Sequence, residues 1–339
     1  MCVREIDCYT WRVQKLPLVI VTPALKDANN GNWQTAKRWA GMLSSAYRVH
    51  LKSRWPDGNA GADARLMIAL HARRSAQSIA NWRDSHPELP LVLVLTGTDL
   101  YHDILRDRSA QQSLEFADAL VVLNEMGKLA LPERLRAKCH VILQSCAERA
   151  CLPKTRRHLR ALMVGHLRQE KDPLTYIEAA RILAARKDII LDHVGAALEP
   201  TLGKQARASA ASQANYHWFG AVPHTAARRK IQAAHVLVHP SQLEGGAHVV
   251  MEAIRSGTPV LASRIDGNIG LLGSDYGGYF APGDAKALAA LIAQVRDNAS
   301  LLDALGEQIR LRSPLFDPLR EADLLRHLIT SLLQSHQSH

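Results

Sequence analysis

Aromatic residues are scarce in this sequence: they fill 5% of the 339 positions, and only four of them are phenylalanine. Proteins that bind single-stranded nucleic acids usually stack the bases on exposed aromatic rings. The net charge of +10 would attract a polyanion, but the lysines and arginines are dispersed and no known nucleic-acid module is present. We therefore expect no nucleic-acid partner, and the basic balance suits phosphorylated small molecules.

Cysteine is also scarce, and its spacing excludes two kinds of small scaffold. The number is odd and no Cys-x-x-Cys pair occurs, so neither a disulfide framework nor a zinc site is indicated. Cys146 falls near the predicted joint between domains. We expect plain reduced thiols at all the cysteines, which are Cys2, Cys8, Cys139, Cys146 and Cys151.

Long apolar runs are missing as well. No stretch reaches the roughly 18–20 residues that a membrane span needs. The opening residues, MCVREIDCYTWRVQK, lack the apolar core of a signal peptide. We therefore expect no membrane partner and a cytoplasmic location.

The composition that remains is that of a globular protein, with 47% hydrophobic and 22% charged residues. A chain of 339 residues is too long for one ordinary core. We expect an N-terminal domain at residues 1–150 and a second domain at residues 151–316, followed by a C-terminal helix at residues 317–339.

Short apolar runs alternate with segments of helical period, which predicts an α/β fold with two Rossmann-like, doubly wound parallel sheets. An apolar stripe from Trp33 to Tyr47 indicates a helix after the first strand. In such sheets, ligands bind at the carboxyl ends of the strands. The expected strands are residues 18–22, 65–70, 91–97, 119–123 and 140–143, then 160–167, 189–195, 217–220, 235–240 and 259–263.

The most informative stretch is residues 240–260, PSQLEGGAHVVMEAIRSGTPV. It follows an expected strand, turns through Gly245 and Gly246, and enters an expected helix. The backbone N–H groups of Gly246, Ala247 and His248 would be free at that helix start. Such a terminus suits a diphosphate, because it supplies hydrogen bonds and a favourable dipole.

Two acids, Glu244 and Glu252, flank this turn and are separated by seven residues. A carboxylate that accepts hydrogen bonds from vicinal hydroxyls gives specificity without acting as a base. We therefore expect one acid to meet sugar hydroxyls and the other to meet ribose hydroxyls, on opposite sides of the diphosphate.

The whole string resembles the retaining GT-B glycosyltransferases of family GT4, whose hallmark is Glu, seven residues, Glu, and then a Gly-x-Pro-Val strand. Further segments match in order: MVGHLRQEKDP from residue 163, GAVPH at residues 220–224 and GYFAPGD at residues 278–284. The resemblance implies the GT-B fold, in which two domains face each other across a cleft and the last helix crosses back onto the first domain. It also implies a UDP-sugar donor.

The resemblance assigns site residues in the second half. In the family an Arg and a Lys grip the diphosphate; Lys171 matches the Lys, whereas His166 stands at the Arg position and Arg168 would supply the missing charge. The implied catalytic residues are Arg168, Lys171 and Glu244. The implied donor-binding residues are Gly245, Gly246, Ala247, His248 and Glu252, with Val222 in the loop that contacts the nucleobase.

The acceptor is expected on the first domain, after its first strand. The segment PALKDANNGNWQTAKRW spans residues 23–39. Its amide and backbone donors at Asn30, Gly31 and Asn32 precede a helix that carries Thr35 and Arg38 in its first two turns. This arrangement suits a small oxyanion, although plain helix capping by Asn32 explains the same residues.

Further acceptor-binding candidates follow two other strands. His71 ends one strand, and Thr96, Thr98 and Asp99 lie in the segment TGTDLY after the next. Thr96 stands where many GT4 enzymes have a histidine. We expect these side chains at the rim of the cleft, with a satisfied core histidine as the alternative for His71.

Five segments together resemble a narrower group, the selenosugar synthases of selenoneine biosynthesis: NNGNWQTAKRW, ALHARRS, LTGTDLY, VGHLRQEKDP and IDGNIGLLG. That likeness implies selenophosphate as acceptor and a UDP-sugar such as UDP-N-acetylglucosamine as donor. A C–Se bond would form at the anomeric carbon, with release of UDP and phosphate. No Asp-x-Asp motif nominates metal ligands, so no tightly bound cofactor is expected, and Mg²⁺ on the diphosphate is left open.

Two other enzyme classes share much of this pattern. One is a GT4-type transferase that acts on a hydroxyl of a lipid, glycan or inositol. The other is a UDP-sugar 2-epimerase, which needs acid and base groups around C2.

Overall fold

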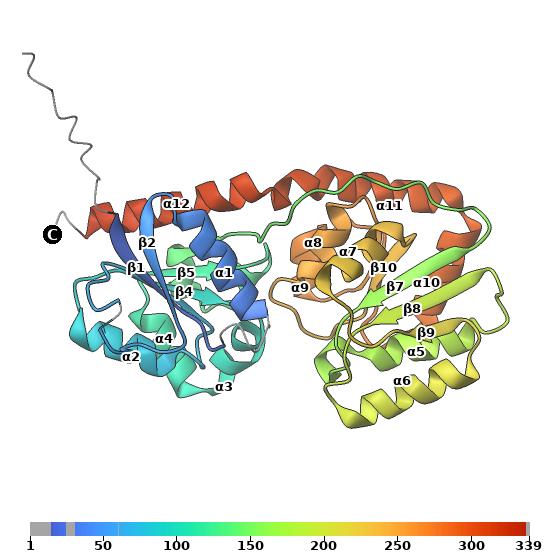
Figure 1. Cartoon of the computed structure of the whole chain (residues 1–339), viewed down its shortest axis with the longest axis horizontal. Coiled ribbons are helices and arrows are strands. Elements are labelled where there is room, and N and C mark those ends of the chain that lie inside the picture. The colour runs from blue at the N-terminus through green and yellow to red at the C-terminus, as the bar shows by residue number, and fades with distance from the viewer. Residues whose placement is uncertain (1–14, 25–30, 60, 337–339) are drawn as a thin grey trace, which may run out of the picture.

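The computed structural model describes residues 15–24, 31–59 and 61–336. Asn30, Cys2 and Cys8 lie outside these residues. Figure 1 shows two α/β domains side by side, with the last helix running along the first of them.

The first domain is a parallel sheet of six strands in the order β2-β1-β3-β4-β5-β6. Its strands are β1 (Leu16–Val21), β2 (Tyr47–Lys52), β3 (Met67–Leu70), β4 (Leu91–Leu95), β5 (Ala119–Val122) and β6 (Cys139–Val141). Its helices are α1 (Gly31–Leu43), α2 (Ala76–Ser85), η2 (Asp99–Asp103), α3 (Ile104–Arg106), α4 (Arg108–Phe116), η3 (Gly127–Ala130) and η4 (Glu133–Lys138).

The second domain repeats this plan with strand order β12-β11-β10-β7-β8-β9. Its strands are β7 (Leu159–Val164), β8 (Ile189–Val194), β9 (Tyr216–Trp218), β10 (Val236–His239), β11 (Val260–Ser263) and β12 (Tyr279–Phe280). Its helices are η5 (Gln169–Lys171), α5 (Pro173–Ile182), α6 (Pro200–Ser212), α7 (His224–Ala233), α8 (His248–Ile254), α9 (Asp266–Leu272), α10 (Ala285–Asp297), α11 (Ala299–Arg312) and η6 (Ser313–Phe316).

The predicted pair of doubly wound parallel sheets is confirmed, but the apolar runs missed two edge strands, β2 and β12. The expected helix was extended to Tyr47, whereas α1 ends at Leu43 and Tyr47 opens β2. Because β2 is the edge strand of its sheet, none of its residues is fully buried. Its sequence YRVHLK therefore lacks the continuous apolar run by which the central strands were found.

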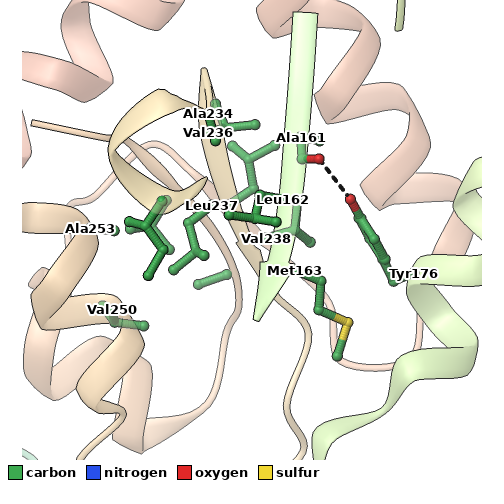
Figure 2. Packing of buried hydrophobic residues seen from close by; sticks show 14 of the residues in the cluster. Ala161, Leu162, Met163, Tyr176, Ala234, Val236, Leu237, Val238, Val250 and Ala253 are labelled. Atoms are coloured by element: carbon green, nitrogen blue, oxygen red, sulfur yellow. Dashed lines mark hydrogen bonds between the residues drawn. The ribbon is translucent and has the colours of Figure 1, made fainter. Parts of the chain in front are cut away.

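The central strands are buried on both faces, as parallel strands covered by helices must be. In the second domain, side chains of β7 and β10 pack against Val250 and Ala253 of α8 (Figure 2). The hydroxyl of Tyr176 donates a hydrogen bond of 3.0 Å to the Ala161 carbonyl. This packing fixes α8, and therefore the turn that precedes it, against the sheet.

The last helix, α12 (Pro318–Ser335), packs on the first domain beside α1. Leu325, Leu328 and Ile329 are buried in the same apolar cluster as Trp39. Glu321 is also buried; its carboxylate accepts hydrogen bonds from Trp39 Nε1 at 2.6 Å and from the backbone of Ser145 at 2.7 Å.

Among the described residues, no helix combines the length and the apolar character needed to cross a membrane.

Candidate functional site

Two adjoining cavities are lined by residues of both domains. The larger, of about 780 Å³, holds Glu252, Gly246 and His248 on its second-domain wall. The smaller, of about 450 Å³, holds Glu244, Lys171 and Arg168. Both cavities are lined by Gly31, Asn32, Thr96 and His166. The two predicted acids therefore face neighbouring compartments of one cleft.

The domains touch where two glycine turns meet. A Cβ on Gly245 would lie 2.6 Å from the Gly97 Cα, and a Cβ on Gly97 would lie 2.8 Å from the Gly245 nitrogen. Gly97 also has a φ of +136°, which favours glycine. Asn124 Nδ2 donates a hydrogen bond of 2.7 Å to the Gly245 carbonyl. Glycine at both positions is what lets the two backbones approach so closely.

Glu244 is a buried, ionised acid. Its carboxylate forms an ion pair with Lys171, and His239 Nε2 lies 3.4 Å from its Oε1. Burial alone would raise the pKa of Glu244, but Lys171, His239 and a hydrogen bond from Ser241 together lower the pKa below its usual value. The acid thus faces the smaller cavity as a carboxylate that can accept hydrogen bonds.

His166, which stands at the position of the family's arginine, carries no charge on this wall. Burial, Arg168 and Lys171 all lower the pKa of His166, so its ring is neutral at pH 7. Its Nδ1 accepts a hydrogen bond of 3.0 Å from the backbone of Ala196. Arg168 lines the smaller cavity and lies 3.5 Å from Glu170. The positive charge on this wall therefore comes from Arg168 and Lys171.

Glu252 is buried on α8 within reach of three basic side chains. Its Oε1 lies 2.6 Å from His224 Nε2, 3.3 Å from His248 Nδ1 and 3.5 Å from Arg228 Nη1. Burial would raise the pKa of Glu252, but His248, His224 and Arg228 lower it. Sequence reasoning missed His224 and Arg228; His224 ends the segment GAVPH, which was the available signal.

The turn before α8 lies partly at the cleft. Gly246 and His248 line the larger cavity and Gly245 lines the smaller one, whereas Ala247 is buried and precedes the first helical residue. Val222, predicted to contact the nucleobase, lines neither cavity and packs against the core of the second domain. His224 takes its place on the wall of the larger cavity.

Asp99 does not line either cavity, contrary to its predicted acceptor role. Its buried carboxylate accepts hydrogen bonds from the backbone of Thr96 and Gly97 at 2.8 Å each, and from the backbone of Ala72 at 2.9 Å. Three N–H donors on one carboxylate fix the turn after β4. Asp99 therefore holds the turn that carries Thr96 at the cavity wall, although its own side chain does not face the cavity.

The remaining predicted acceptor residues separate into two groups. His71, Thr98 and Thr96 line the smaller cavity, beside Glu244. Thr35 and Arg38 line the larger cavity, where each already has a partner. Gln144 Nε2 donates to Thr35 Oγ1 at 2.5 Å, and Arg38 forms an ion pair of 3.0 Å with buried Glu321.

Among the residues that the structure describes, free thiols are present and a metal-ligand cluster is not. Within residues 15–24, 31–59 and 61–336, no group of three or more His, Cys, Asp or Glu side chains is arranged to hold a metal ion. Cys139, Cys146 and Cys151 are free thiols. Cys146 lines the larger cavity, and burial raises its pKa.

The second domain matches a known family. Residues 147–312 fit the family model described as "Glycosyl transferases group 1". No curated protein matches the chain in sequence.

Solved structures match over nearly the whole chain. Sucrose-phosphate synthase (tll1590) from Thermosynechococcus elongatus has a TM-score of 0.76 at 16% identity, over 95% of this chain and 100% of that one. Anabaena Alr3699/HepE in complex with UDP has a TM-score of 0.74 at 14% identity, over 94% and 100%. The pneumococcal O-GlcNAc transferase GtfA, in complex with UDP and GlcNAc, has a TM-score of 0.65 at 17% identity, over 79% and 57%. The chain thus has the GT-B fold, and its residues 147–312 match the group 1 family model.

Proposed function

We propose that this chain is a UDP-sugar-dependent glycosyltransferase whose acceptor is selenophosphate and whose product is a 1-selenosugar. The observation that supports a UDP-sugar donor is the pair of buried acids, Glu244 and Glu252. Glu244 and Glu252 are held ionised on neighbouring cavities by separate sets of basic side chains. Two such carboxylates suit the hydroxyl groups at the two ends of a nucleotide sugar.

In this proposal the donor lies along the second-domain wall. Glu252 accepts hydrogen bonds from the ribose hydroxyls in the larger cavity. Glu244 accepts hydrogen bonds from the sugar in the smaller cavity, and Lys171 and Arg168 neutralise the diphosphate. UDP is favoured as the nucleotide because HepE and GtfA, which share the fold, hold UDP in their crystals.

In the proposed reaction, little general-base catalysis is needed. The selenium of selenophosphate is an anionic nucleophile that attacks the anomeric carbon, forming the C–Se bond. The bond from that carbon to the UDP oxygen breaks, and UDP leaves with the electron pair. Water then cleaves the Se–P bond, which gives phosphate and the 1-selenol sugar. Positioning and stabilisation of the departing diphosphate are the enzyme's contributions.

The acceptor half rests on the narrower resemblance and on the small size of the cavity beside Glu244. At about 450 Å³ and lined by Arg74, Arg168 and Lys171, it suits a compact anion. A long glycan or lipid acceptor would instead favour an extended groove with aromatic or apolar residues.

The test is to incubate the purified protein with UDP-N-acetylglucosamine and to measure UDP release with and without selenophosphate. We expect release only when selenophosphate is present, and a product of the corresponding selenosugar mass. Equal release with thiophosphate or with water would argue against selenium specificity. Formation of an epimer from UDP-N-acetylglucosamine alone would identify an epimerase instead.

A panel of hydroxyl acceptors separates the remaining alternative. If glycerol, inositol or a monosaccharide releases UDP while selenophosphate does not, the chain is a GT4-type transferase to a hydroxyl. Mass spectrometry of each product also identifies the sugar that is transferred.

A further inference from the structure

Three side chains on the first-domain wall of the smaller cavity come from two neighbouring loops and lie beside Asn32 and Thr96. His71 and Arg74 follow β3, and Thr98 follows β4. These residues face the cavity that Arg168, Lys171 and Glu244 line from the second domain. The wall therefore lies opposite the diphosphate-binding residues of the proposed donor.

The protonation of His71 is fixed by its surroundings. The backbone N–H of Arg74 donates a hydrogen bond of 3.3 Å to His71 Nδ1, so this nitrogen carries no proton. Asp99 Oδ2 lies 4.0 Å from Nδ1 and Asp103 Oδ2 lies 3.9 Å from Nε2, but burial lowers the pKa of His71 below its usual value, so the ring is neutral at pH 7. Its proton is then on Nε2, which lies 3.2 Å from Thr98 Oγ1. His71 is buried, with a left-handed φ of +74° that few residues other than glycine adopt. The ring is thus held in one orientation.

This tautomer sets the role of Thr98. Because His71 Nε2–H donates to Thr98 Oγ1, the Thr98 hydroxyl keeps its own proton for another acceptor. Thr98 is exposed and lines the smaller cavity. The hydroxyl can therefore donate a hydrogen bond to an oxyanion in the cavity.

Arg74 supplies the charge on the same wall. Two acids line this cavity, Glu244 and Glu170. Glu244 pairs with Lys171 and Glu170 lies near Arg168, so neither acid is left to pair with Arg74. Arg74 is exposed and forms no ion pair with an acid among the residues that the structure describes, whereas the neighbouring Arg73 pairs with Asp103 at 2.9 Å. Without a bound anion, the lining therefore carries one uncompensated guanidinium on its first-domain side.

We propose that Arg74 and Thr98 form the subsite for the tetrahedral oxyanion of the acceptor, with His71 as the positioning residue that holds the Thr98 hydroxyl as a donor. A guanidinium fork and a hydroxyl suit the oxygens of a phosphate-like group and leave the selenium free to face the sugar. The subsite replaces Thr35 and Arg38 as the acceptor contact. It rests on the proposed function, because it assigns the donor to the opposite wall.

The main test is steady-state kinetics of Arg74→Ala. We expect the KM for selenophosphate to rise about 10- to 100-fold, since a charged hydrogen-bond donor is removed, while the KM for the UDP-sugar stays within about twofold. Arg106→Ala is the matched control, because Arg106 is an exposed arginine of the same domain outside both cavities. A rise in the KM for the UDP-sugar instead would assign Arg74 to the donor and overturn the subsite.

Thr98 and His71 are tested by coupling. Thr98→Val should raise the KM for selenophosphate, and Thr98→Ser, which keeps a hydroxyl, should restore it. In the Thr98→Val background, His71→Gln should cause little further rise, because His71 acts through the hydroxyl. Full additivity of the two changes, or failure of the serine variant to restore the KM, would contradict the assigned role of His71.

Inorganic phosphate tests the subsite without turnover. We expect phosphate to bind the UDP-loaded protein in calorimetry and to bind Arg74→Ala at least tenfold more weakly. If the wild type binds phosphate in this way but forms no selenosugar, the subsite stands and the proposed acceptor is wrong. If it forms the selenosugar while phosphate binds both proteins equally, the proposed function stands and the subsite is wrong.

Discussion

The two walls of the cleft use opposite electrostatic designs. On the second-domain wall, Glu244 and Glu252 are buried acids, and the basic side chains around each of them lower its pKa. On the first-domain wall, the buried acid Asp99 turns away to hold backbone N–H groups. What faces the cavity there is a neutral His71, a hydroxyl and an unpaired Arg74. We propose that the second-domain wall receives the donor, with its hydroxyl groups at the two acids and its diphosphate at Lys171 and Arg168, and that the first-domain wall receives the oxyanion of the acceptor.

The largest effect should come from the cation on the second-domain wall. Lys171→Met removes the partner of Glu244 and one charge that would stabilise departing UDP. We expect kcat to fall roughly 100- to 1,000-fold. Lys204→Met, which removes an exposed lysine of α6, is the control. If kcat fell by less than about threefold, Lys171 would not stabilise the departing UDP, and the leaving group would not lie on this wall.

A smaller effect, on the binding of UDP, is expected when Glu252 is changed. Glu252→Ala removes the proposed ribose contact and leaves His224, His248 and Arg228 without their shared acid. The Kd for UDP, measured by calorimetry, should rise roughly 10- to 100-fold. Arg74→Ala should leave this Kd unchanged. If the two variants weaken UDP binding alike, the division between the walls is wrong.

The contact between the walls is tested at Gly245. The new Cβ of Gly245→Ala would crowd Gly97, so the domains must separate slightly and kcat/KM should fall about tenfold. Gly306→Ala is the control, because its Cβ would meet only Pro259 Cγ, at 4.0 Å. Equal kinetics for the two variants would show that the close approach of the glycine turns is not needed for turnover.

The smallest effect concerns stability and pH. Burial lowers the pKa of His193 and of His239 from 6.5 to about 4. Between these values the unfolded chain binds protons that the folded chain does not, so stability is full above pH 6.5 and falls as the pH drops toward 4. Urea unfolding at pH 7 and pH 5 measures the difference. It should shrink in His193→Gln, and an unchanged difference would contradict a neutral His193.

The comparison of the walls also explains what could be predicted from sequence. Glu244, the glycine turn and Glu252 are close together in the chain, so their spacing already placed them at the end of one strand. The six-stranded sheets followed from apolar runs, except for two edge strands: β2, which is half-exposed, and β12, which has only two residues. These features depend on local order and burial, which the sequence carries directly.

The first-domain wall depends on contacts between distant residues. Arg38 was predicted to meet the acceptor, but its partner Glu321 lies on α12. No local pattern indicates such a pair. Asp99 occupies a strand end, as expected, but which way its carboxylate turns is decided by the free N–H groups of the loop. Arg74 was overlooked because one exposed arginine after a strand has no distinguishing spacing.

The central claim is that a nucleotide sugar lies along the second-domain wall, with its nucleoside and sugar ends at different acids. A crystal structure of the protein with bound UDP tests this most directly. We predict that the ribose hydroxyls donate hydrogen bonds to Glu252 and that the diphosphate lies beside Lys171 and Arg168. A uridine bound in the first domain, or a diphosphate remote from Lys171, would contradict the claim.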